Sequence, residues 1–301
     1  MVSMTNADSL PGEWTHRLVH VQGQRLHVAE CGQPTAPLVL FLHGATGGWF
    51  EWRRVLPLLA DAPIHAVAAS LRGYGQSDRT PQGYTPAGAA ADTAGLIRAL
   101  GHSCALIVGQ GFGAWVGWTL ANTHPQMVSG MIGCGAAHPA VFHRNRGFGA
   151  TVQARWQLRG VRATSRQRRI LDHVTAQSGS YLGAEFAASE QGALSVALIR
   201  DSLERGALRP AVEHLEWWAG TNPARLRLWL RQLGDPRLAA PRRTALLVGE
   251  SDTCTPAALV QASCADATVV PKVGHNIALE APEVLARAIR ERLEWLPRYS
   301  A

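Results

Sequence analysis

The sequence predicts an α/β fold: a mostly parallel sheet of eight strands with a helical segment inserted into it. Between residues 15 and 140, apolar strand-like runs alternate with segments of helical length, and strand patterns return after residue 240. Such alternation is typical of βαβ units around one parallel sheet. Between about residues 140 and 238 only helical patterns remain. A chain of 301 residues is long enough for one such domain with an insertion.

The first half of the chain holds most of the predicted strands. THRLVHV (15–21) and QRLHVAE (24–30) form a predicted hairpin around Gln22 and Gly23. LVLFLHG (38–44) is continuously apolar, which is typical of a parallel strand covered on both faces. The remaining predicted elements of this half are strands at 64–70, 105–108 and 128–134 and helices at 49–59, 86–100 and 112–120.

The second half begins with the helical insertion. Its predicted helices span 150–158, 165–176, 192–205 and 211–219. Strands follow at 244–249 and 267–270, and a helix at 282–295 closes the chain. We therefore expect an α/β core made of residues 1–140 and 239–301, and a helical cap made of residues 141–238. In open α/β sheets ligands bind at the carboxyl edge of the strands, and we expect the cap to cover that edge.

The composition is that of a globular protein. The apolar fraction is 47% and the charged fraction 17%, far from the values of disordered chains. The net charge is +7, and all basic residues except Lys272 are arginines. A general enrichment in Ala and Arg explains this charge better than an anionic partner. Because no stripe of interleaved aromatic and basic residues occurs, we expect no nucleic-acid partner.

Targeting segments and cysteine motifs give no positive signal. The first residues, MVSMTNADSLPGEW, lack the apolar stretch of a signal peptide, and no run has the length of a membrane span. The cysteines are odd in number, scattered, and contain no CxxC pair. We therefore expect a cytoplasmic protein with no stable membrane insertion, no disulfide framework, no metal site and no cofactor, with a homodimer left open.

A glycine-rich corner, LIVGQGFGAWVGW (106–118), connects a predicted strand to a predicted helix. This pattern is typical of a nucleophile elbow, G-x-S-x-G, whose central residue is Ser, Cys or Asp in a working enzyme. Here Gly109 and Gly113 keep the outer glycines, but the centre is Gly111. The alternative is an ordinary turn glycine with nothing catalytic lost.

An acid and a histidine follow the elbow in the order expected of a catalytic relay. Asp252 lies three residues beyond the strand at 244–249, and His275 follows the strand at 267–270. In such a relay the carboxylate fixes the tautomer of the imidazole and stabilises its protonated form. The imidazole can then act as a base toward a nucleophile or a water molecule. This pair argues against the ordinary-turn interpretation of Gly111.

Several motifs together resemble the epoxide hydrolase branch of the α/β-hydrolase superfamily. They are LFLHGATGGWFEWRRVLPLLA, LRGYGQSDRTPQGYT, VGQGFGAWV, VGESDTCTP and VGHNIALEAPE, and DTAGLIRALGH is similar to actinobacterial members. The resemblance implies an α/β-hydrolase fold with an inserted cap. It also implies an elbow G-H-D-x-G, whose aspartate opens the epoxide and forms an ester. Here Gln110 replaces the His and Gly111 replaces the Asp, so no covalent intermediate can form at this position.

The resemblance also implies roles for other residues. The backbone N–H groups of Phe112 and Ala45 would form an oxyanion hole. The pocket would be lined by His43, Gln110, Trp156 and Trp217. The family's two cap tyrosines, which hydrogen-bond the epoxide oxygen, would fall near Trp156 and near His214 and Leu215, and neither place holds a tyrosine. The only tyrosine of the cap segment is Tyr181.

Some residues have two open interpretations. Cys134 could line the pocket as a substitute nucleophile, although a free cysteine on a strand is more often buried core. Trp217 and Trp218 are ordinary packing residues of the cap or pocket-lining residues. The arginines of the early cap are a solvated helix face or contacts to an anionic ligand or membrane surface (Arg155, Arg159, Arg162, Arg166, Arg168 and Arg169).

Three functions remain open. The first is an epoxide hydrolase-like protein that binds a small apolar ligand under the cap without covalent catalysis. The second is a surviving hydrolase of epoxides or esters, or a lyase, in which His275 and Asp252 activate a water molecule. The third is a structural interaction protein with an exposed apolar patch. An engineered knockout could also carry Gly111, but it would not explain Gln110.

Overall fold

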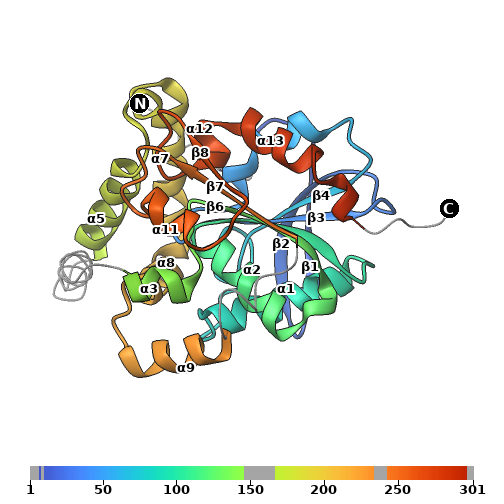
Figure 1. The fold of residues 1–301 in the computed structure, drawn as a ribbon, viewed down its shortest axis with the longest axis horizontal. Helices are drawn as coiled ribbons and strands as arrows, with labels where there is room; N and C mark the ends of the chain where they lie inside the picture. The colour runs from blue at the N-terminus through green and yellow to red at the C-terminus, as the bar shows by residue number, and fades with distance from the viewer. Residues whose placement is uncertain (1–6, 8–9, 146–166, 234–242, 297–301) are drawn as a thin grey trace.

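The computed structural model describes residues 7, 10–145, 167–233 and 243–296. The eight-stranded, mostly parallel sheet predicted from the sequence is confirmed, with the strand order β1-β2-β4-β3-β5-β6-β7-β8 (Figure 1). Its strands are β1 (Thr15–Val21), β2 (Gln24–Gly32), β3 (Leu38–Leu42), β4 (His65–Ala69), β5 (Ala105–Gln110), β6 (Val128–Cys134), β7 (Thr244–Gly249) and β8 (Ala267–Val270). Each predicted strand is present to within two residues at either end.

The register brings the chemistry-bearing loops to one edge. Among the described strands, the antiparallel pairs are those of β2 with its two neighbours, β1 and β4. The pairs from β4 through β3, β5, β6 and β7 to β8 are all parallel. The loops that follow β3, β5, β7 and β8 therefore leave the sheet at the same edge, where side chains far apart in the sequence can meet.

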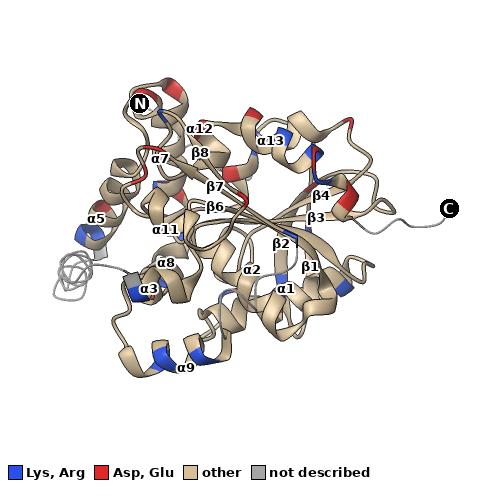
Figure 2. Cartoon of the chain, in the orientation of Figure 1, with Lys and Arg blue, Asp and Glu red and all other residues tan. Residues whose placement is uncertain are grey.

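Helices cover both faces of the sheet. In Figure 1, α1 (Pro86–Ala99) and α2 (Phe112–Thr123) lie on one side of the sheet, and α12 (Ile277–Glu280) and α13 (Pro282–Arg290) lie on the other. The strands from β3 to β7 contain no Lys, Arg, Asp or Glu, and the charged residues lie on helices and loops and on the outer strands β1 and β2 (Figure 2). The uncharged strands explain why the sheet can be buried from both sides. None of the described helices is long and apolar enough to cross a membrane.

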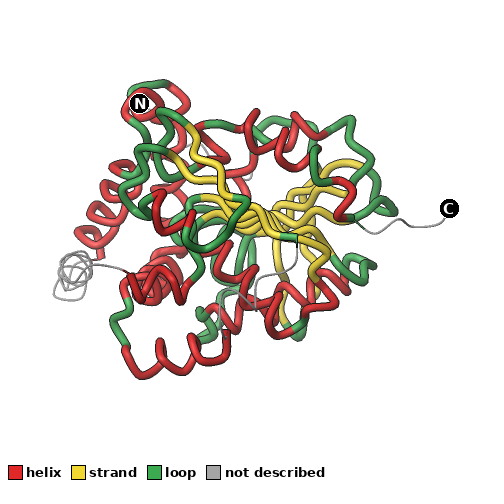
Figure 3. Tube along the Cα trace, viewed as in Figure 1, coloured by secondary structure: helices red, strands yellow, loops and turns green. Residues whose placement is uncertain are grey.

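Between β6 and β7 the described residues form helices and no strand (Figure 3). They are α3 (Pro139–Asn145), α5 (Gln167–Ser180), α6 (Ala184–Ala187), α7 (Glu190–Ser202), a kinked turn (Leu203–Ala207), α8 (Leu208–Ala219) and α9 (Pro223–Leu233). The sequence patterns missed α3, α6 and α9. The predicted helix at 150–158 lies outside the described residues, as do Trp156 and the arginines Arg155, Arg159, Arg162 and Arg166.

One predicted helix is wrong. Residues 49–59 form two short 3₁₀ turns, Trp49–Trp52 and Leu56–Leu59, instead of one helix. The first turn is buried at every residue, so it has no solvent face of the kind that defines an amphipathic helix. Pro57 then opens the second turn, and a proline lacks the N–H that a continuous helix would need there.

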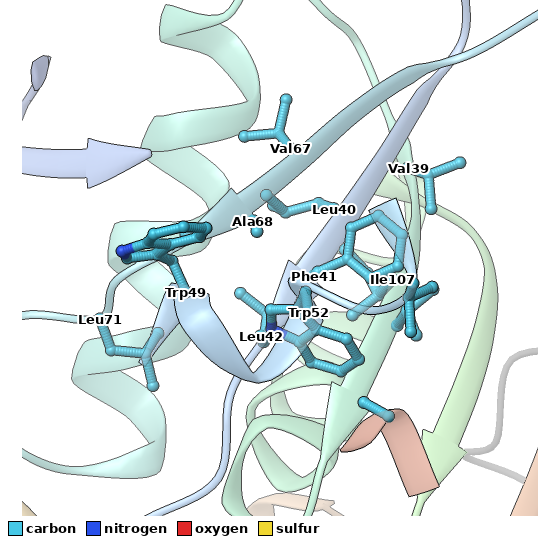
Figure 4. Packing of buried hydrophobic residues seen from close by; sticks show 14 of the residues in the cluster. Val39, Leu40, Phe41, Leu42, Trp49, Trp52, Val67, Ala68, Leu71 and Ile107 are labelled. Carbon is cyan, nitrogen blue, oxygen red and sulfur yellow. The ribbon is translucent and has the colours of Figure 1, made fainter. Parts of the chain in front are cut away.

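Aromatic packing fixes the loop that follows β3. Every residue of β3 is buried, and the ring of Trp52 packs against that of Phe41 with 5.1 Å between centroids (Figure 4). Trp49 lies nearby in the same cluster, close to Leu71 in the view of Figure 4. The buried strand β3 precedes the loop from Gly44 to Gly48 and the two buried tryptophans follow it, so the loop is held at both ends.

We predict that Gly113→Ala destabilises the fold strongly. A Cβ at Gly113 would lie 2.0 Å from the carbonyl oxygen of Leu42, so α2 would have to move away from β3. We expect a loss of about 3 kcal/mol in the free energy of unfolding, measured in urea, since the obstacle is backbone. The matched control is Gly179→Ala in α5, where a Cβ would meet only Val196 at 3.4 Å. Its expected change is below about 1 kcal/mol; equal effects of the two substitutions would contradict the prediction.

Candidate active site

The corner after β5 has the backbone of an elbow. Gly111 follows the last residue of the strand and is itself the N-cap of α2, with φ 51° and ψ −110°. Its N–H donates to the carbonyl of Cys134 at 2.8 Å, and its carbonyl accepts from the N–H of Ala114 at 3.1 Å. Because φ is positive, this conformation favours glycine. The sharp strand-to-helix turn is therefore present while the side chain at its tip is absent.

His275 and Asp252 meet at this corner. Nδ1 of His275 lies 2.9 Å from Oδ2 of Asp252, and the other carboxylate oxygen accepts the N–H groups of Cys254 and Thr255, both at 2.8 Å. A Cβ placed on Gly111 would lie 3.3 Å from Nε2 of His275. Nδ1 of the imidazole thus contacts the carboxylate of Asp252, and Nε2 lies beside Gly111 at the tip of the elbow. This is the arrangement expected of a relay.

The surroundings of His275 favour its protonated form. Burial by itself lowers the pKa of the imidazole, but the charge and hydrogen bond of Asp252, together with the charges of Glu51 and Glu280, raise it above its usual value. An imidazole with a raised pKa is a stronger base. It is neutral, and so able to accept a proton, only at higher pH.

A cavity joins these residues to the helices between β6 and β7. Its empty volume is about 880 Å³, a figure that includes the open space at its mouth. Gln177 and Ser178 of α5, Ile199 of α7, and Leu215 and Trp218 of α8 contribute to its wall. The described lining residues of the core are Gly44, Ala45, Thr46, Glu51, Gln110, Gly111, Phe112, Trp115, Gly135, Ala136, Cys254, Thr255, His275, Asn276 and Leu279.

The structure places several predicted site residues in this cavity. Gly111, Phe112, Ala45, Gln110 and His275 all line it. Gln110 donates from Nε2 to the backbone carbonyl of His275 at 2.8 Å, so it holds the loop of His275 against the elbow. Its Oε1 is buried with no hydrogen-bond partner among the described residues. Asp252 stands directly behind His275.

Two predicted pocket residues are corrected. His43 is fully buried and does not line the cavity: Nδ1 lies 2.7 Å from the carbonyl of Gly44, and Nε2 accepts the N–H of Leu71 at 3.0 Å. Both ring nitrogens are used inside the loop, and burial lowers the pKa of His43 to about 4. Trp217 packs against Trp229 on the other side of α8, with 5.5 Å between ring centroids.

Trp218, the neighbour of Trp217, is the tryptophan of α8 that lines the cavity. A difference of one residue turns a helical side chain by about 100°, and the loose register of the helical segment could not decide between them. Near the second expected tyrosine site, Leu215 lines the cavity while His214 is buried, with Nδ1 3.0 Å from Oη of Tyr74.

Cys134 is not a nucleophile of this site. Its side chain is fully buried and is not among the described lining residues of the cavity. Burial raises the pKa of its thiol far above the usual value, so the thiolate does not form near neutral pH. The interpretation as core cysteine holds.

Two residues of the cavity were missed by the sequence patterns. Glu51 is 3% exposed and its pKa is raised to about 7, because burial disfavours the charged carboxylate. Tyr181 lies at the cavity with its ring 6.1 Å from the ring of His275, and its carbonyl accepts the N–H of His275 at 2.8 Å. The sequence carries Tyr181 as the only tyrosine of its segment, but nothing in the pattern placed it beside the histidine.

One corner of the site has metal-ligating atoms. Donor atoms of Asp252, Cys254 and His275 lie within 4.8 Å of one another and could hold a metal ion. An ion held by Nδ1 of the histidine would have to displace its hydrogen bond to Asp252. The expectation of no metal and no cofactor stays a prediction.

Comparison with known proteins gives a consistent result. Residues 39–288 match the model of the "Alpha/beta hydrolase family". Over 122 residues the chain is 36% identical to "Epoxide hydrolase B" of Mycobacterium tuberculosis strain H37Rv, which covers 39% of this chain and 34% of that protein. Over 120 residues it is 39% identical to "Epoxide hydrolase A" of the same strain, covering 39% and 37%. These matches span about a third of the relatives' length.

A solved structure supports the fold over nearly the whole chain. Cfl2 from Burkholderia cenocepacia superimposes with a TM-score of 0.74 at 23% identity, covering 93% of this chain and 95% of that one. At that identity the likeness concerns the fold alone. The α/β-hydrolase fold expected from the motifs is confirmed.

We predict that the buried acid makes stability depend on pH. Glu51 has a folded-state pKa of about 7 against an ordinary value of 4.5. The stability it contributes is therefore present below its unfolded pKa and is lost as the pH rises through its folded pKa. A shift of this size corresponds to about 3 kcal/mol.

Urea unfolding of Glu51→Gln and of the wild type, at about pH 5 and about pH 8, checks this. The variant should gain stability relative to the wild type as the pH rises. Glu283→Gln, which removes an exposed carboxylate, is the control and should show no such trend. A difference between Glu51→Gln and wild type that is the same at both pH values would contradict the prediction.

Proposed function

The chain belongs to the α/β hydrolase family, and from this membership we propose that it binds a small apolar molecule in the cavity and hydrolyses it without an ester on the elbow. The attacking group is a water molecule activated by His275, with Asp252 orienting the imidazole. The substrate is an epoxide or an ester of mainly apolar character. The names of the matched mycobacterial proteins support the epoxide.

The position of the imidazole carries the proposal. Nε2 of His275 lies 3.3 Å from the point that a Cβ of Gly111 would occupy, and Gly111 lines the cavity. A water molecule in that space would be within hydrogen-bond reach of Nε2. With an aspartate at the elbow the same space would hold the nucleophile. Removing the side chain therefore makes room for the reactant that a direct hydrolysis needs.

The reaction then requires one proton acceptor and one site for the oxyanion. As the water oxygen bonds to the substrate carbon, its proton passes to Nε2, and the C–O bond of the epoxide or the C=O π bond of the ester gives its electrons to oxygen. The N–H groups of Phe112 and Ala45, both at the cavity, can hold that oxyanion. With the epoxide, the proton on His275 passes to the alkoxide oxygen of the opened ring, and the product is a diol. With the ester, the oxyanion re-forms the C=O bond while the C–O bond to the alkoxy group breaks, and that oxygen takes the proton from His275, which yields an acid and an alcohol.

A binding protein without turnover is the alternative. Gly111 favours it, because the step that splits the family reaction into two easier parts is missing. The raised pKa of His275 favours it as well, since a protonated imidazole cannot accept a proton. Hydrolysis and simple binding would use the same cavity. They differ only in whether the bound molecule is hydrolysed with the help of His275.

We predict that hydrolysis of aryl epoxides or p-nitrophenyl esters depends on His275 and proceeds without a covalent intermediate on the protein. In H₂¹⁸O, with enzyme in excess over substrate, the label should enter the product in the first turnover and should not enter the protein. His275→Ala should lower kcat at least ~100-fold. The rate should rise with pH and level off above the raised pKa of His275, since only the neutral imidazole accepts the proton. Binding with no turnover on any probe would select the alternative.

We further predict that a carboxylate at the elbow changes the mechanism. Gly111→Asp should give a covalent adduct with an epoxide on the peptide that carries position 111, with faster epoxide opening than the wild type. His275 must move by a few tenths of an ångström to admit the new Cβ. Gly111→Ala is the matched control, because it adds the same Cβ at the same positive φ without the carboxylate. An adduct in the wild type on residues 109–113 would refute direct hydrolysis.

A further inference from the structure

Glu51 is a buried acid of the cavity that the proposed reaction does not use. It lies on the 3₁₀ turn after β3, and its carboxylate is held at both oxygens. Oε2 accepts the N–H of Gly44 at 2.9 Å, and Oε1 accepts from Nδ2 of Asn276 at 3.0 Å. Since Asn276 follows His275 directly, Glu51 connects the loop after β3 to the loop that carries the imidazole.

The loop after β3 leaves room for this carboxylate. A Cβ at Gly47 would lie 2.2 Å from Oε1 of Glu51 and 2.8 Å from Oε2. A Cβ at Gly44 would lie 3.6 Å from Oε1, and the Cα of Gly44 is 4.0 Å from the point that a Cβ of Gly111 would occupy. Gly44 therefore lies near both the carboxylate and the tip of the elbow, and the acid is close to the position of the missing nucleophile.

The charges around Glu51 are coupled to His275. The charge of His275 lowers the pKa of Glu51 and that of Glu51 raises the pKa of His275, while Arg53, on the same turn as the acid, also lowers the pKa of Glu51. Arg53 is itself buried, and burial lowers its pKa to about 10. Burial disfavours a carboxylate that has no cation near it, so the charges of Arg53 and His275 oppose the rise that burial causes in the pKa of Glu51.

Other groups face the pair from the surrounding elements. Burial, with the charge of Glu51, raises the pKa of Cys134 on β6 and of Tyr74 in the loop after β4, so both stay neutral near it. On the side of His275 the remaining carboxylates are Asp252, on Nδ1, and Glu280 of α12, whose charge also raises the pKa of the imidazole. The ionisable partner of Glu51 across the cavity is thus the imidazole itself.

We propose that Glu51 supplies, from the loop after β3, the negative charge that the elbow lacks, and that this charge holds the proton and the orientation of His275. An aspartate at position 111 would place its charge next to Nε2. The charge of Glu51 acts on His275 through space, and its hydrogen bond to Asn276 holds the loop that carries the imidazole. Glu51 is thus a positioning residue. Its effect on the imidazole is independent of the proposed function, whereas its effect on turnover rests on that function.

NMR titration of the His275 imidazole tests this without any need for turnover. The signal is assigned by its loss in His275→Ala. Glu51→Gln removes the charge and keeps the size of the side chain, and it should lower the pKa of His275 by about one unit. Gly47→Ala, which pushes the carboxylate from its place, should shift it in the same direction. Glu283→Gln on the exposed face of α13 is the control and should not shift it.

Moving the charge back to the elbow completes the test. Gly111→Asp should raise the pKa of His275, and the double variant Gly111→Asp with Glu51→Gln should return it close to the wild-type value. An unchanged pKa of His275 in both folded variants, Glu51→Gln and Gly47→Ala, would overturn the proposal. If the wild type turns over no substrate, the proposed function fails while the titration still decides the role of Glu51. If it is active, Glu51→Gln should move the rise of the rate to lower pH.

Discussion

The sharp turn from β5 into α2 is the constraint on which the site depends. It brings the start of α2 against the end of β3, so close that a Cβ at Gly113 would meet the carbonyl of Leu42 at 2.0 Å. With the helix in that place, the tip of the turn at Gly111 points into the cavity beside His275. The turn would aim a nucleophile if one were present. Glycine at its tip adopts the positive φ of this turn without strain, so the backbone of the elbow is present without a side chain at its centre.

The ionisable groups of the site are buried where strands of the sheet end. The uncharged strands from β3 to β7 form the apolar interior, and Asp252, His275 and Glu51 all lie in the loops that follow strands. Hydrogen bonds within these loops hold each side chain. Asp252 accepts two backbone N–H groups, Glu51 accepts from Gly44 and Asn276, and His275 is bonded to Asp252. This division lets one core support stability while the edge holds a hydrogen-bonded set of ionisable groups.

The sequence predicted the sheet well because buried strands have one pattern, continuous apolar residues between turns, and the elbow and relay followed from their places at strand ends. The failures have a common physical cause. His43, Glu51 and the 3₁₀ turns near Trp49 belong to a loop whose residues are buried almost throughout, so no periodicity shows which side chain faces the cavity. Trp217 failed for a related reason: α8 carries adjacent tryptophans, and only the packing of the helix decides that Trp218 turns toward the cavity.

The buried ionisable groups favour chemistry over simple ligand binding. A buried ion pair stabilises a fold poorly compared with apolar residues of similar size, because the desolvation of both charges offsets their attraction. The raised pKa of Glu51 is a direct sign of that opposition. A cavity that only bound an apolar molecule would gain nothing from a histidine paired with the carboxylate of Asp252. A cavity that must take a proton from water and return it to a departing oxygen needs such groups, and this argument supports direct hydrolysis as the function of the site.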